Sequence, residues 1–252
     1  MSEALLMVRN LSLAFGKEQD RVLDDLNFEL QAHRTLSILG QSGCGKTTLL
    51  KAIAGLAEPQ SGEIFFDGQN LQGVPPHQRG IVYLYQEPLL FPHLNVFENV
   101  AFGLRLRKLP EGEIHQKTSG MIERLQLGDQ QGKMPHQLSG GQKQRVSFGR
   151  ALIINPPLLL LDEPLGNLDT GTRAAMQQLL REVTHEFRIT AIFVTHDLKE
   201  AVLMGDRIGY MERGALELYP DLPAFMADPR TGVRGEIEFW EKLKKGNHED
   251  GF

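Results

Sequence analysis

The chain has 252 residues, a formal net charge of −5, 41% hydrophobic residues and a single cysteine, Cys44. This length supports one large α/β domain or two smaller lobes, and the acidic balance argues against a surface devoted to binding nucleic acid. One cysteine excludes an intramolecular disulfide, which fits a reducing compartment.

The chain offers no candidate for a targeting or membrane-spanning segment. Its first ten residues, MSEALLMVRN, lack the basic start and long apolar run of a secretory signal. The apolar stretch 151–161 is interrupted by Asn155, Pro156 and Pro157, and it is much shorter than the roughly 20 residues that cross a bilayer. We therefore expect the chain itself not to span a membrane.

The first sixty residues predict strands followed by a strand, loop and helix. Residues 6–15 and 26–30 alternate apolar and polar side chains, which predicts antiparallel strands. Residues 35–39 are a short apolar run ending in Gly40, and residues 46–54 have a helical pattern. A glycine-rich loop therefore lies between a buried strand and a helix.

The rest of the chain alternates strand and helix except in its middle, where residues 95–150 are mostly helical. This pattern predicts an α/β core with an inserted helical lobe. The other predicted strands are 62–68, 80–85, 158–161, 189–194, 206–212 and 215–219, and the predicted helices of the second half are 172–187 and 198–204.

The glycine-rich loop, GQSGCGKT at residues 40–47, matches the phosphate-loop pattern G-x-x-x-x-G-K-[ST] in the strand-to-helix context that the pattern requires. Its glycines let backbone N–H groups surround the β- and γ-phosphates, Lys46 supplies a positive charge, and the Thr47 hydroxyl binds Mg²⁺. The residues assigned to this cradle are Gly40, Ser42, Gly43, Cys44, Gly45, Lys46, Thr47 and Thr48.

A second motif, LLLLDEP at residues 158–164, places two carboxylates at the end of an apolar strand. Asp162 would hold Mg²⁺ and its water shell, and Glu163 would polarise an attacking water. Because side chains alternate along a strand, both carboxylates approach one site only where the strand has ended. Gln86 and His196 also follow predicted strands, so we expect them at the same crevice.

A third motif, MPHQLSGGQKQRV at residues 134–146, has Ser139 at the predicted start of a helix. A helix N-terminus presents free N–H groups and attracts anions. The chain thus carries a second phosphate-binding element. On its helical lobe this element is poorly placed to close over Lys46 of its own chain, but it suits the phosphate on a second copy.

Together these motifs resemble the ATP-binding cassette of ABC transporters, from Phe15 to about residue 229, in family order. The resemblance implies a P-loop NTPase core with an N-terminal antiparallel β-subdomain and a helical lobe carrying the signature LSGGQ. It also implies that Phe15, where the family most often has Tyr, stacks on adenine. Glu163 would be the general base, His196 would contact the γ-phosphate, and Gln86 would touch Mg²⁺ and the water.

The resemblance further implies a head-to-tail homodimer with two shared ATP sites. Ser139, Gly140, Gly141 and Gln142 would close over the partner's ATP, and Asp169 in NLD would cross to the other subunit. The predicted organisation is one ABC ATPase domain, 1–252. It has a nucleotide-binding core at 1–86 and 157–230, a helical lobe at 87–156, and a C-terminal helix and tail at 231–252.

The expected function is that of an ATP-hydrolysing subunit that drives a membrane transporter. Residues 91–104, FPHLNVFENVAFGL, resemble importers with one cassette per chain. The expected partners are a permease, contacted through residues 86–104, and an extracytoplasmic solute-binding protein, with no nucleic acid. The chain would then lie peripherally on the cytoplasmic face of the inner membrane.

Two alternatives remain open: an exporter ATPase, and a soluble cassette ATPase acting on DNA or ribosomes. The second is disfavoured because the chain has one cassette, no long heptad run and an acidic balance. An ordinary P-loop kinase or GTPase would have no reason to keep LSGGQ.

Overall fold

The computed structural model describes residues 4–15, 21–166 and 168–238. Within them lie two β-sheets and seven α-helices with defined bounds, and residues 233–238 are also helical. The predicted strands of the first thirty residues are β1 (Ala4–Ala14) and β2 (Arg21–Gln31), which pair antiparallel. With β4 (Ser61–Phe66) and the short β5 (Gln69–Asn70) they form a sheet in the order β2-β1-β4-β5. The predicted N-terminal antiparallel sheet is therefore confirmed.

The second sheet is six-stranded, in the order β10-β9-β3-β8-β7-β6, and all of its neighbouring strands are parallel except β10 with β9. Its strands are β3 (Thr35–Leu39), β6 (Ile81–Leu84), β7 (Leu158–Asp162), β8 (Thr190–Thr195), β9 (Arg207–Glu212) and β10 (Ala215–Leu218). In register, Leu39 faces Thr195, and Asp162 faces Val194. The carboxyl ends of β3, β7 and β8 thus lie at one edge of the sheet.

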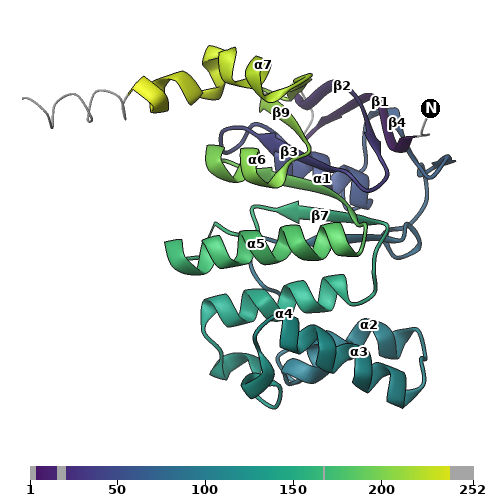
Figure 1. The fold of residues 1–252 in the computed structure, drawn as a ribbon. Helices are drawn as coiled ribbons and strands as arrows, with labels where there is room; N and C mark the ends of the chain where they lie inside the picture. The colour runs from purple at the N-terminus through teal and green to yellow at the C-terminus, as the bar shows by residue number, and fades with distance from the viewer. Residues whose placement is uncertain (1–3, 16–20, 167, 239–252) are drawn as a thin grey trace, which may run out of the picture.

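The helices are α1 (Lys46–Ala54), α2 (Val96–Leu106), α3 (Glu111–Arg124), α4 (Gly140–Leu152), α5 (Thr170–Glu186), α6 (Leu198–Met204) and α7 (Leu222–Ala227). Short 3₁₀ turns occur at Pro76–Gln78, Gly128–Gln130, Pro135–Gln137 and Pro229–Thr231. Figure 1 shows α2 and α3 at the opposite end of the molecule from β1, β2 and β4. The segment predicted as a helical lobe, 87–156, contains α2, α3 and α4.

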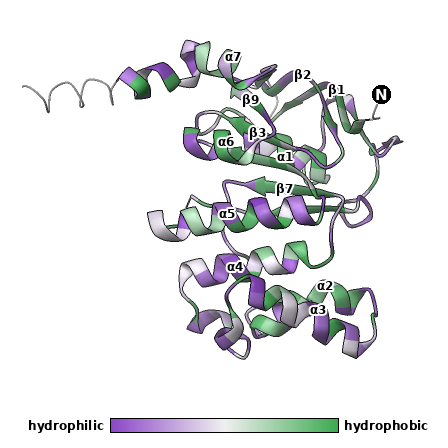
Figure 2. Ribbon diagram, in the orientation of Figure 1, coloured by the Kyte–Doolittle hydropathy of each residue, from purple (hydrophilic) through white to green (hydrophobic). Residues whose placement is uncertain are grey.

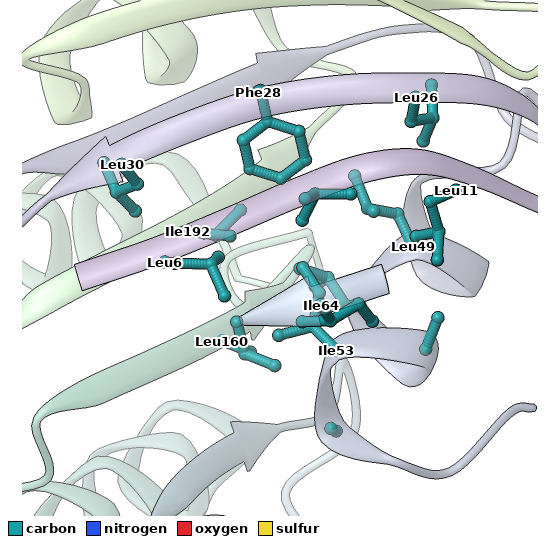
Figure 3. Packing of buried hydrophobic residues seen from close by; sticks show 14 of the residues in the cluster. Leu6, Leu11, Leu26, Phe28, Leu30, Leu49, Ile53, Ile64, Leu160 and Ile192 are labelled. Carbon is teal, nitrogen blue, oxygen red and sulfur yellow. The ribbon is translucent and has the colours of Figure 1, made fainter. Parts of the chain in front are cut away.

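Two large hydrophobic clusters cover the opposite faces of the six-stranded sheet, because alternate residues of its central strands point to opposite sides. Leu158 and Leu160 of β7 belong to the cluster with α1 and the antiparallel sheet. Figure 3 shows Leu160 of this cluster near Ile53 of α1. Leu159 and Leu161 pack instead with α2, α4 and α5.

Burial follows the hydropathy of the sequence. All five residues of β7 are buried, whereas α5 buries one face only. Figure 2 accordingly shows hydrophobic residues on β7 and a mixture of hydrophilic and hydrophobic residues along α5. A central strand covered on both sides is typical of a parallel sheet with helices around it. This packing holds the ends of β3, β7 and β8 in fixed positions.

Candidate functional site

The loop between β3 and α1 depends on two glycines that allow close approach of neighbouring strands. Gly45, the N-cap of α1, has φ 113°, and a Cβ there would lie 2.5 Å from the carbonyl oxygen of Val22. A Cβ on Gly40 would lie 2.4 Å from the carbonyl oxygen of Met211. Only glycine, which has no Cβ, can adopt the positive φ of Gly45 and lie this close to the backbone oxygens at both positions. The loop is thus packed between β2 and β9, and Ser42 and Gly43 are exposed at its tip.

Lys46, the first residue of α1, is buried with its ammonium group turned onto the loop. Its Nζ donates to the carbonyl oxygens of Gly40 at 2.7 Å and Gln41 at 3.0 Å, and lies 3.6 Å from Oε1 of Glu163. A buried ammonium needs such partners because desolvation of an unpaired charge is costly. Lys46 therefore links the loop to the carboxylate that follows β7.

Asp162, the last residue of β7, accepts two hydrogen bonds from hydroxyl groups. The Thr47 hydroxyl donates to Oδ1 at 2.9 Å, and the Tyr83 hydroxyl of β6 donates to Oδ2 at 2.7 Å. Burial, followed by this hydrogen bond, raises the pKa of Tyr83. The two motifs predicted to share a site, at 40–47 and 158–164, are therefore in direct contact.

Glu163 turns toward the loop because the chain leaves the strand at this residue. Its φ is 44°, in the left-handed region that a residue other than glycine seldom adopts. Its N–H still bonds to the carbonyl oxygen of Val194 at 3.1 Å. This backbone turn is how two consecutive carboxylates reach one site, as the sequence required.

His196, which follows β8, adds an imidazole group to the polar side chains of this site. Its Nδ1 lies 2.9 Å from Oε2 of Glu163, and its ring is largely exposed. Gln86 is also exposed, and its Nε2 lies 3.6 Å from where a Cβ on Gly166 would stand. The structure thus places Gln86 beside the turn after Glu163. Phe15, the residue that follows β1, is 61% exposed.

The signature segment begins α4 as predicted, with a capping box at Ser139. The Ser139 hydroxyl accepts from the N–H of Gln142 at 3.3 Å, and the Gln142 side chain accepts from the N–H of Ser139 at 3.0 Å. Ser139 and Gly140 are exposed. No hydrogen bond among the residues described joins this segment to the phosphate loop. The start of α4 is therefore exposed and, within the described part of the chain, is not bonded to the loop of the same chain.

Asp169, predicted to reach a second subunit, caps α5 in this chain. Its carboxylate accepts from the N–H of Thr172 at 3.0 Å, and chiefly this hydrogen bond lowers the pKa of the exposed Asp169 carboxyl. A Cβ on Gly141 would lie 2.8 Å from Cγ2 of Thr172, so the starts of α4 and α5 are adjacent. Among the predicted site residues, Asp169 and residues 139–142 therefore lie together at the starts of α4 and α5, apart from the phosphate loop at residues 40–47.

Sequence reasoning missed two residues of this region. Tyr83 is one: the predicted strand 80–85 carries two tyrosines, Tyr83 and Tyr85, and their positions in the strand do not show which of them reaches Asp162. The other is Gln144, a buried α4 residue whose Nε2 donates to the carbonyl oxygen of Pro164 at 2.8 Å. This bond ties the signature helix to the residue after Glu163, and only the tertiary structure reveals it.

The site offers a cation, two carboxylates, hydroxyl groups and an imidazole around a glycine loop. This chemistry can hold a polyphosphate and polarise a water molecule. Among the residues described, no group of three His, Cys, Asp or Glu side chains could hold a metal ion. The helices described also include none long and apolar enough to cross a membrane.

Comparison with known proteins finds ATP-binding subunits of ABC transporters among the similar chains. A family profile described as ABC transporter matches residues 23–166. The spermidine/putrescine import ATP-binding protein PotA of Thermobifida fusca is 46% identical over 202 residues, which is 80% of this chain. The alignment covers 53% of that relative, so the chain spans about half the length of the curated protein it matches.

Solved structures agree in fold. CbiO1 of Clostridium perfringens, part of the ABC transporter complex cbiONQ, matches with a TM-score of 0.81 and 30% identity over 93% of this chain and 95% of its own. The ATP-binding cassette MJ0796, described as dimeric in a post-hydrolysis state with ADP and Pi, matches with a TM-score of 0.75 and 31% identity. That match covers 84% of this chain and 96% of MJ0796.

Proposed function

The chain belongs to the ABC transporter family, and from this premise we propose that it is the ATP-hydrolysing subunit of a solute importer. The observation that carries the proposal is the contact between the loop and the end of β7. Lys46 lies 3.6 Å from Glu163, and Thr47 bonds to Asp162 at 2.9 Å. A phosphate loop joined to two carboxylates in this way suits the binding and hydrolysis of a nucleoside triphosphate.

In this proposal the polar residues divide the work of binding and hydrolysing ATP among them. Lys46 turns its ammonium group from the carbonyl oxygens of the loop to the phosphates of ATP. Glu163 takes a proton from the attacking water, and His196, whose Nδ1 lies 2.9 Å from Glu163, holds that carboxylate and contacts the γ-phosphate. Phe15 offers an exposed ring face on which adenine can stack.

The residues at the loop also fit Mg²⁺, which prefers hydroxyl, carboxylate and amide oxygens. The Thr47 hydroxyl and the Asp162 carboxylate already lie together, and Gln86 is near the adjoining turn. These residues would hold the ion, which would neutralise phosphate charge. Tyr83 would keep the Asp162 carboxylate oriented through its hydrogen bond.

A second copy of the chain would complete each ATP site. The exposed start of α4 supplies N–H groups with no partner in the phosphate loop of the same chain, which suits an anion on another subunit. The dimeric state of MJ0796 supports a dimer here. We propose a head-to-tail homodimer in which residues 139–142 and Asp169 face the partner.

The surface of residues 86–104 is the proposed contact with the permease. Tyr85 and Leu89 expose large hydrophobic side chains beside a cavity of about 110 Å³, and Arg150 of α4 lines its wall. An apolar patch with a charged rim is typical of a protein contact. The relative named as an import protein supports import. The proposal further includes a solute-binding protein outside the membrane and places this chain on the cytoplasmic face.

The proposal is tested by ATP turnover of the purified chain and of Glu163→Gln. The variant should bind ATP but turn over slower by about 10²- to 10⁴-fold, the scale of losing a general base. Glu182→Gln, at a glutamate on α5 bonded to Gln178, is the matched control and should keep parental turnover. Parental turnover in Glu163→Gln would contradict the assignment.

The import role has its own experiment. Adding the permease in vesicles with a solute-loaded binding protein should raise ATP turnover and drive solute inward. Turnover that stays at the level of the isolated chain, with solute moving outward or not at all, would reject import.

A further inference from the structure

A pair of opposite charges between α5 and α6 lies next to the segments that follow Glu163 and His196, and the proposed chemistry does not use it. Arg173 is in the first turns of α5 and Glu200 is in α6, and Nε of Arg173 lies 3.8 Å from Oε1 of Glu200. Both atoms are buried, and neither has a hydrogen-bond partner among the described residues. A buried charge needs a function or a partner to offset its desolvation.

Glu200 is connected to the backbone on both sides of His196. Its Oε2 accepts from the Thr195 hydroxyl at 2.7 Å, and the same hydroxyl oxygen accepts from the N–H of Asp197 at 3.0 Å. Asp197 in turn caps α6, because its carboxylate accepts from the N–H of Glu200 at 3.1 Å. The residues flanking His196 are thus held in one network that centres on Glu200.

Arg173 is connected to the turn that follows Glu163. Its NH2 nitrogen donates to the carbonyl oxygens of Leu168 at 3.2 Å and Gly166 at 3.5 Å. The N–H of Gly166 bonds to the carbonyl oxygen of Glu163 at 3.2 Å. The arginine also reaches the Asp197 carboxylate at 3.5 Å. One guanidinium group therefore touches both the turn after Glu163 and the segment after His196.

We propose that Arg173 and Glu200 are positioning residues that set the distance between Glu163 and His196. Arg173 fixes the turn that begins at Glu163, Glu200 fixes the backbone around His196, and their attraction joins the two. The planar fork of arginine can donate in several directions at once, which lysine cannot. This inference rests on the proposed ATPase function and assigns Arg173 and Glu200 the role of holding Glu163 and His196 in place.

The experiment separates positioning from simple stabilisation with two single variants and one double variant. Arg173→Lys keeps the charge but loses the fork, and Glu200→Gln keeps the shape but loses the charge. The double variant Arg173→Met with Glu200→Met removes both members of the pair, so no buried carboxylate is left without its arginine and stability should be regained. Asp197 loses its contact with Arg173 in this variant, but its side chain is 32% exposed and water replaces the contact. Arg181→Lys, at an exposed arginine on α5, is the matched control. The measurements are kcat, KM for ATP, and Tm.

Misplacement of reacting groups by a fraction of an ångström lowers kcat, so we expect a loss of about ten- to a hundredfold in each single variant. KM for ATP should change less than about twofold, since neither residue contacts the phosphate loop. The double variant should regain Tm but keep the low kcat, and Arg181→Lys should match the parent. A role in stability alone predicts instead that kcat recovers together with Tm.

Parental kcat in Arg173→Lys and Glu200→Gln, or in the double variant, would overturn the positioning role. Glu163→Gln, assayed beside them, keeps the two proposals distinct. If it turns over at the parental rate, the proposed function itself fails. If it is slow while the Arg173 and Glu200 variants are fast, only the positioning role fails. Each variant is assayed at a temperature at which circular dichroism shows it folded.

Discussion

Replacing Tyr83 by Phe removes one hydroxyl group from β6 and leaves Asp162 with the Thr47 hydroxyl as its remaining side-chain partner. A hydrogen bond to a charged group contributes about 1.5–3 kcal/mol net. We therefore expect the free energy of unfolding to fall by about 2 kcal/mol. For a chain of this size that loss lowers Tm by roughly 4–8 °C.

The stability lost in Tyr83→Phe should become smaller as pH rises above 10. Burial and the hydrogen bond to Asp162 raise the pKa of Tyr83 above its ordinary value of 10.0. Above that value the unfolded chain releases the phenol proton while the folded chain retains it, so the folded state loses relative stability as pH rises. The full contribution of Tyr83 to the free energy of unfolding is present below pH 10.0 and declines above it.

The assay is urea unfolding of the parent, Tyr83→Phe and Tyr85→Phe between pH 7 and pH 11. Tyr85 is the matched control, because its ring lies 4.5 Å from that of Tyr83 while its side chain is more exposed. Tyr85→Phe should change the free energy of unfolding by less than about 0.5 kcal/mol. An equally small effect of Tyr83→Phe, or one that stays constant above pH 10, would show that the hydrogen bond from Tyr83 to Asp162 does not stabilise the fold.

Two further predictions concern the phosphate loop. Gly45→Ala forces a Cβ to within 2.5 Å of the Val22 carbonyl oxygen at φ 113°, so it should destabilise the fold by about 1–3 kcal/mol and weaken ATP binding. Gly112→Ala, in α3 with open space around its Cα, should be neutral or stabilising in the same denaturation and binding assays. Burial raises the pKa of the Cys44 thiol, so a maleimide should label it slowly at neutral pH and block hydrolysis, and ATP should slow labelling further. Labelling that leaves turnover intact would contradict the position assigned to this thiol.

The local pattern of the sequence was enough to predict the framework of the site. The expected limits of β3, α1 and α6 match the observed elements, since apolar runs flanked by glycine or a capping Asp197 mark their ends. Helix α5 begins two residues earlier than the predicted residue 172, because Asp169 caps it. The predicted tail, 231–252, lies largely outside the described residues, and the division into core and lobe stays a prediction.

What the sequence could not supply is the set of contacts between distant side chains. The left-handed backbone of Glu163 depends on where β8 and the loop hold the chain, not on local propensity. The bond from Tyr83 to Asp162 spans 79 residues, and the approach of Arg173 to Glu200 requires α5 and α6 to pack together. Such contacts follow from tertiary packing, which periodicity does not encode.

Sharing of each ATP site between two chains is tested most directly by mixing two inactive variants. Lys46→Ala removes the phosphate charge from its own loop, and Ser139→Arg blocks the helix N-terminus offered to the partner. In a mixed head-to-tail dimer one site has an intact loop and an intact signature, while the other has neither. With half of the dimers mixed and one intact site in each mixed dimer, we expect ATP turnover at about a quarter of the parental rate. Turnover that stays at the level of the separate variants would contradict shared sites.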